Sequence, residues 1–183
     1  MSRIPEITRR EQLTEDQRHH YDSIIASRKR LGAPYCYLLH CPDLAARTAH
    51  VVGYSLFESD FPRDLKELAI CTVAREMDCM FEWAAHEGDA REAGISEATI
   101  SAIRDGMAPE GMSEQEAQIV RYVQEMLRRP HRVSDPTFQA LHSRLGDARM
   151  AELTGIIGAY TGLACSLNAF GVQTPEGMPV LPT

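Results

Sequence analysis

The sequence lacks the motifs that mark several large classes of protein. It has no Cys-x-x-Cys pair, no glycine-rich phosphate loop and no Gly-x-Ser-x-Gly motif. A local dithiol, a P-loop nucleotide site and a serine-hydrolase elbow are therefore excluded. The net charge is −7, and the largest basic cluster is the short run Arg28–Arg30. We therefore expect no nucleic-acid partner.

The N-terminal residues contain no apolar signal core, and the five cysteines have no regular spacing. Both features favour reduced cysteines and a cytoplasmic protein. A single stretch, Leu153–Thr174, carries no charge and is long enough to span a bilayer. Glycine, threonine, serine and asparagine dilute it, so we predict a buried helix and no membrane partner.

The sequence also lacks strand signals, because no segment alternates apolar and polar residues with a period of two. Apolar residues instead recur at spacings of three and four between capping residues, which predicts an all-α fold of about seven or eight helices. We expect one domain over residues 1–183, with extended arms at 1–13 and 172–183. The expected helices include segments at about 14–31, 43–59, 96–104 and 114–128. A loop or a single turn is expected at 35–41.

The most chemically capable segment is Cys79–His86, which contains a thiol, a carboxylate, an imidazole and the only tryptophan. On a helix, Cys79, Glu82 and His86 would fall within about a 60° sector over two turns. Asp78 is a good N-cap, and it would place the thiol in the first turn, where the helix dipole lowers a thiol pKa. The alternative is a buried structural cysteine beside an ordinary helix-surface pair. Three ligands on one helix rarely complete a metal centre, so no metal is expected.

A longer pattern resembles the carboxymuconolactone decarboxylase family, which also includes the AhpD-type alkyl hydroperoxidases. It consists of Lys66-Glu67-Leu68-Ala69-Ile70, then Cys79-x-x-Glu82-Trp83-x-x-His86, then Ala93-Gly94-Ile95-Ser96. The family core matches residues of about 43–110. The resemblance implies an all-α fold, a homo-oligomer (commonly a trimer or hexamer), and no cofactor.

The resemblance also implies site residues. Glu67, Cys79 and His86 match the glutamate, first cysteine and histidine of the peroxidase branch, whereas Glu82 stands where that branch has its second cysteine. A two-thiol peroxide cycle cannot close within such a motif. The Glu82–His86 pair is more similar to the decarboxylase side of the family. There, His86 would be the general acid/base, Glu82 would orient it or share its proton, and Glu67 would support it.

Three functions are therefore open. The first is a cofactor-free enzyme that transfers a proton on a small organic acid or lactone, in a decarboxylation or a related lyase or isomerase step. The second is a thiol peroxidase that uses Cys79 alone at the motif. The third is a non-catalytic, oligomeric binding protein.

Overall fold

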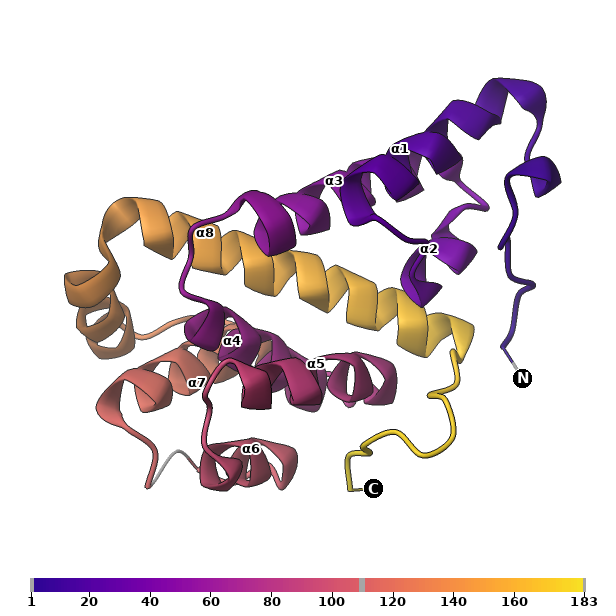
Figure 1. Ribbon diagram of the computed structural model, residues 1–183. Helices are drawn as coiled ribbons and strands as arrows, with labels where there is room; N and C mark the ends of the chain where they lie inside the picture. Colours follow the sequence, from indigo (N-terminus) through magenta and orange to yellow (C-terminus); the bar gives the residue numbers. More distant parts are fainter. Residues whose placement is uncertain (1, 109–110, 183) are drawn as a thin grey trace. The chain divides into compact units, whose positions relative to one another are not determined.

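The computed structural model describes residues 2–108 and 111–182, and within them the fold is all-α, as expected (Figure 1). No strand occurs in the described ranges. The helices, in chain order, are α1 (Arg18–Arg28), α2 (Ala33–Leu38), α3 (Pro42–Gly53), α4 (Arg63–Glu76), α5 (Met80–Glu92), α6 (Glu97–Arg104), α7 (Glu114–Leu127) and α8 (Asp135–Phe170). A π-helical segment, Tyr54–Glu58, extends α3.

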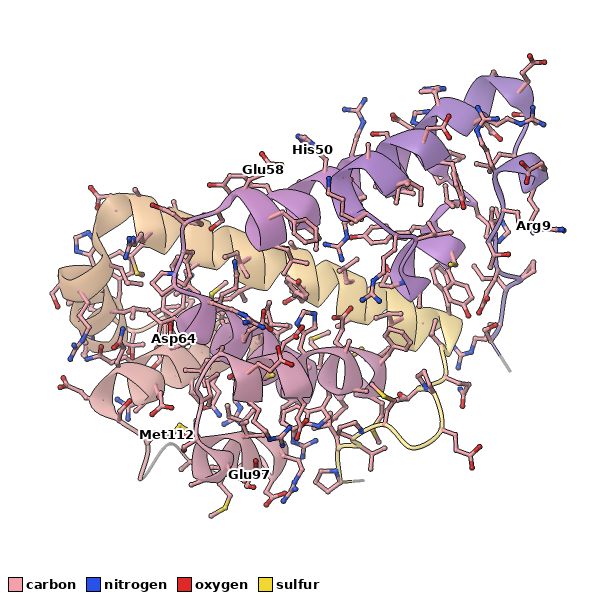
Figure 2. All side chains as sticks on the ribbon, viewed as in Figure 1. Arg9, His50, Glu58, Asp64, Glu97 and Met112 are labelled. Carbon is pink, nitrogen blue, oxygen red and sulfur yellow. The ribbon has the colours of Figure 1, made fainter. Side chains whose placement is uncertain are left out.

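Capping residues set most of these boundaries. The Ser113 hydroxyl accepts from the Glu116 amide, and the Glu116 carboxylate accepts from the Ser113 amide, which completes a capping box for α7. Ser96 caps α6 in the same way through the amide of Thr99. Acidic residues such as Asp64 in α4 and Glu97 in α6 lie in first turns (Figure 2), where the helix dipole favours negative charge.

Two N-terminal expectations were wrong. The expected helix at 14–31 is shorter, because a 3-10 turn fills Glu15–Gln17 and Lys29 ends α1 in the left-handed region at φ 65°. The segment expected as a loop forms the short helix α2, with Pro34 in its first turn. Proline suits the first turn, which lacks intrahelical N–H partners in any case.

Contacts group the chain into two compact units, which are described separately. The first comprises the described residues up to Asp60 together with Cys165–Gln173. The second comprises Phe61–Ala164 and the described residues from Thr174 onward. The single domain expected from the sequence remains a prediction.

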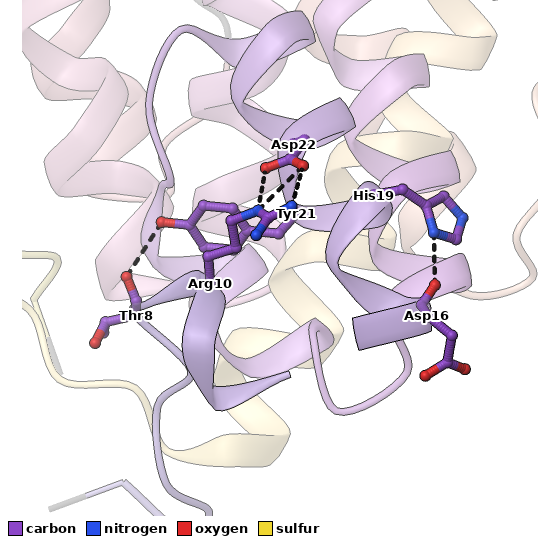
Figure 3. Close-up of polar contacts among 6 residues, drawn as sticks. All are labelled: Thr8, Arg10, Asp16, His19, Tyr21 and Asp22. Carbon is purple, nitrogen blue, oxygen red and sulfur yellow. Dashed lines mark hydrogen bonds and ion pairs between the residues drawn. The ribbon is translucent and has the colours of Figure 1, made fainter. Parts of the chain in front are cut away.

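In the first unit, α1 packs against α3 around a core that includes Ile24, Leu39 and Ala49. The N-terminal arm is tied to α1 by polar contacts (Figure 3). Arg10 Nε donates to Asp22 Oδ1 at 2.8 Å, and the Tyr21 hydroxyl donates to the Thr8 carbonyl at 3.3 Å. The arm is therefore irregular but attached, with one 3-10 turn at Arg10–Gln12.

In the second unit, α4 packs against α5 and α7. All residues of α4 from Leu65 to Ala74 are buried, so this helix forms the centre of the unit. Gly146, at φ 70°, interrupts α8 where a break was expected.

By length and composition alone, α8 could cross a membrane. The central helix of a soluble protein meets the same test, and Leu153, Ile157 and Tyr160 on α8 are buried. We therefore interpret α8 as a core helix, and the absence of a membrane partner remains a prediction.

Candidate active site

Glu67 and His86 meet where α4 packs against α5. His86 Nδ1 lies 2.8 Å from Glu67 Oε2, within hydrogen-bond distance. Glu67 is in the buried run of α4, and His86 is on the buried side of α5. Packing between two helices therefore brings together residues that are far apart in sequence.

Glu82 lies one turn before His86 on α5 and approaches the other ring nitrogen. Its Oε2 is 3.6 Å from His86 Nε2, which is longer than a hydrogen bond. The exposed fractions are 3% for Glu67, 4% for Glu82 and 9% for His86. The imidazole thus lies between two buried carboxylates, one at each nitrogen.

This environment changes the pKa of His86. Burial opposes the charged imidazolium and lowers the pKa, but the hydrogen bond to Glu67 and the charges of Glu67, Glu82 and Asp89 raise it. The carboxylates prevail, so the pKa lies above the usual 6.5. His86 therefore holds its proton more tightly in the folded protein than an ordinary histidine does.

Cys79, rather than the predicted Asp78, is the N-cap of α5. Asp78 adopts a left-handed conformation at φ 47°, and its carboxylate accepts from Arg75 at 2.6 Å. The Asp78 side chain is therefore used in the turn and does not cap the helix. The Cys79 amide donates to the Ala74 carbonyl at 2.8 Å, which fixes the backbone.

The thiol of Cys79 is at a helix N-terminus, as expected, but the residue is 0% exposed. None of the five cysteines is in a disulfide. Cys71 is buried in α4, and desolvation raises its pKa well above the usual value. Cys71 is therefore a protonated thiol at neutral pH and a poor nucleophile.

Sequence reasoning missed Tyr160. Its ring, on α8, meets the His86 ring edge-on, with the centroids 5.1 Å apart and an interplanar angle of 87°. Tyr160 is almost fully buried. No local spacing links α8 to α5, so only the long apolar character of α8 hinted that it would pack beside the site.

One set of residues has the geometry of a cation site. Ligand atoms of Glu67, His86 and Asp89 all lie within 4.8 Å of one another. Arg63 lies 3.7 Å from Asp89, so a cation there would face an existing positive charge. The contact between His86 Nδ1 and Glu67 also joins a donor to an acceptor without any ion. The expected absence of a metal remains a prediction.

Two hollows lie in the second unit, away from His86. One, of about 350 Å³, is lined by residues near the N-termini of α4, α6 and α7, including Asp64, Ser96 and Ser113. The other, of about 260 Å³, is lined by charged residues that include Arg75 and Arg128. Glu67, Glu82 and His86 line neither of them.

Residues 42–125 match the sequence model of the carboxymuconolactone decarboxylase family. The chain belongs, through this segment, to the carboxymuconolactone decarboxylase family. Glu67, Cys79, Glu82 and His86 all lie within the matched segment. Most members of the family are enzymes. A search of curated proteins finds no significant match.

Solved structures of this family's fold resemble the chain over most of its length. A peroxidase-related protein with an AhpD core from Ralstonia eutropha JMP134 has a TM-score of 0.72 at 16% identity, covering 96% of this chain and 93% of that one. The debrominase Bmp8 has a TM-score of 0.72 at 14% identity, covering 93% and 91%. An Agrobacterium tumefaciens protein described as a putative AhpD antioxidant defence protein has a TM-score of 0.66 at 19% identity, covering 76% and 95%. These similarities establish an AhpD-like fold.

Proposed function

We propose that this carboxymuconolactone decarboxylase family member is a cofactor-free enzyme that transfers a proton on a small organic acid or lactone. The reaction is a decarboxylation or a related lyase or isomerase step. The observation that supports this most is the position of His86, with Nδ1 at 2.8 Å from Glu67 and Nε2 at 3.6 Å from Glu82. In this arrangement one nitrogen is held and the other faces a second carboxylate.

His86 is the general acid/base in this proposal. Its Nδ1–H donates to the Glu67 carboxylate, which fixes the ring and the tautomer. Nε2 is then the nitrogen whose proton moves. Because the Glu82 oxygen lies beyond hydrogen-bond length, Nε2 is not locked in a bond to it and can serve a substrate atom.

The chemistry balances without a redox partner. In a decarboxylation, the bond between the carboxyl carbon and the adjacent carbon breaks, and its electron pair enters a conjugated enolate. Carbon dioxide leaves, and His86 Nε2–H delivers a proton to carbon. Solvent then returns a proton to Nε2. Glu82 orients the imidazole or shares its proton during this exchange.

A thiol peroxidase is the second candidate, because Cys79 is the N-cap of a 13-residue helix. The dipole of α5 favours a thiolate at that position. The complete burial of Cys79 and the raised pKa of Cys71 weigh against it. A peroxide cycle would also need a resolving thiol from a partner molecule.

The deciding experiment measures turnover of a panel of carboxylated lactones and small unsaturated acids, alongside peroxide consumption, in four proteins. These are the wild type, His86→Asn, Cys79→Ser and His142→Asn. His142 is the matched control, because its Nε2 pairs with Asp147 at 2.6 Å outside the site. We expect His86→Asn to lower kcat by about 100-fold or more, the usual contribution of a general acid/base. Cys79→Ser and His142→Asn should stay within about threefold of wild type.

Turnover in D₂O adds a readout specific to proton delivery, since the product should gain deuterium at the carbon that lost carboxylate. Peroxide consumption that disappears in Cys79→Ser would replace the proposal with the thiol peroxidase. A protein that binds panel compounds without turning any of them over would be a binding protein instead.

A further inference from the structure

Exposed apolar side chains are concentrated on one short stretch of the first unit. Among the described residues, the exposed large apolar side chains include Leu44 at 52%, Val51 at 51%, Tyr54 at 46% and Phe57 at 56%. All four belong to α3 or to the π-helical segment Tyr54–Glu58. We call this stretch, Pro42–Glu58, the outer α3 face.

The opposite side of α3 is already occupied. Ala45, Ala49 and Val52 are fully buried in the first unit, where α3 packs against α1. A helix that is apolar on two sides needs a partner on each. The outer α3 face is therefore built for a second contact.

The spacing along this face is that of a helix–helix seam. Its central positions are Leu44, Arg47, Val51, Tyr54 and Glu58, at intervals of three, four, three and four residues. These are the intervals of the a and d positions along which two helices pack. All five are exposed, and Figure 2 shows His50 and Glu58 extending outward from this stretch.

The charges on the face favour one orientation of a partner helix. Arg47 lies near one end and Glu58 at the other. If an identical helix packed in parallel, Arg47 would meet Arg47 and Glu58 would meet Glu58. If it packed antiparallel, with Val51 opposite the partner's Tyr54, the same register would place Arg47 opposite the partner's Glu58. The pattern is thus complementary to its own antiparallel copy.

We propose that the outer α3 face is an interface between two copies of this chain, packed antiparallel about a two-fold axis. A two-fold interface uses the same patch on both subunits, so its pattern must be self-complementary, as this one is. Phe57 broadens the seam beside Tyr54, and its own position is held by the Arg28 guanidinium, whose Cζ lies 5.8 Å from the ring centroid. A two-fold contact yields a dimer or, with a further interface, a hexamer. It does not yield an isolated trimer.

The test is the mass of the protein in solution, measured by light scattering and sedimentation, for the wild type and Val51→Glu. A carboxylate at the centre of the seam would be buried without a partner, so the dissociation constant should rise about tenfold or more and the assembly should split to half its mass. Met107→Glu is the matched control, because Met107 is also an exposed large apolar residue but lies outside the outer α3 face. It should leave the mass unchanged.

A charge swap tests the orientation. Arg47→Glu and Glu58→Arg should each weaken the assembly, and the double variant should restore it, because opposite charges again face each other. Circular dichroism checks that each variant is folded, since Arg47 also contacts Asp43 at 3.2 Å within α3. A monomeric or trimeric wild type, an unchanged mass in Val51→Glu, or a double variant that fails to reassemble would each overturn the proposal.

Discussion

At the residue scale, the site depends on one imidazole held between carboxylates from two helices. The sequence could identify Cys79, Glu82 and His86 together, because spacings of three and four place residues on one helix face. It could not show that Glu67 and Glu82 approach different ring nitrogens of His86, since that depends on how α4 and α5 pack. Tyr160 was out of reach for the same reason.

The raised pKa of His86 makes a prediction about stability and pH. A pKa raised by folding means that the folded state binds the proton more tightly than the unfolded state, whose histidine titrates near 6.5. The stabilisation is therefore complete below about pH 6.5 and is lost as the pH rises through the folded pKa. Glu67→Gln removes the charged acceptor and should lower the His86 pKa, which flattens this dependence.

Urea unfolding at a series of pH values measures the dependence, and NMR titration of the imidazole measures the pKa. Glu92→Gln serves as the control, because Glu92 is an exposed carboxylate on the same helix that pairs with Arg63 at 3.3 Å. Its pH profile should match the wild type. Parallel pH profiles for wild type and Glu67→Gln would show that Glu67 does not hold the proton on His86.

At the element scale, the helices whose ends carry capping residues were predictable, and the short ones were not. Ser96, Ser113 and Gly94 mark the ends of α5, α6 and α7, and each behaves as the sequence indicates. The six-residue helix α2 was missed because it is too short for a 3.6-residue repeat to appear. The N-cap of α5 was misplaced by one residue, since Asp78 pairs with Arg75 instead.

Helix α5 offers two glycines with opposite expected responses to alanine. Gly94 follows the helix at φ 95°, a conformation that disfavours any Cβ, so Gly94→Ala should destabilise the protein by about 1–2 kcal/mol. Gly88 lies inside α5, and no neighbouring atom lies within 4 Å of the position that a Cβ would take. Gly88→Ala should therefore stabilise the protein by about 0.5–1 kcal/mol. Urea midpoints compare the two directly, and shifts of the same sign would contradict the backbone argument.

At the scale of the whole molecule, the sequence suggested one domain, and contacts group the chain into two units. Composition and length could not decide this, because each unit has its own buried residues, such as Ile24 in the first and Ile157 in the second. Helix α8 contributes residues up to Ala164 to the second unit and residues from Cys165 to the first. A continuous helix shared in this way is a physical reason for the two units to unfold together.

The single tryptophan makes that cooperativity measurable. Trp83 is buried in the second unit, so its fluorescence reports on that unit, whereas far-UV circular dichroism reports on every helix. Ile24→Ala removes a fully buried side chain from the first unit and should cost about 2–5 kcal/mol. If the chain is one cooperative domain, this distant substitution should lower the Trp83 transition midpoint as much as the circular dichroism midpoint, because two-state unfolding gives coincident transitions. Ile157→Ala, in the second unit, is the matched variant and should behave identically. A Trp83 midpoint that stays at the wild-type value in Ile24→Ala, beside a biphasic circular dichroism curve, would mean that the two units unfold independently.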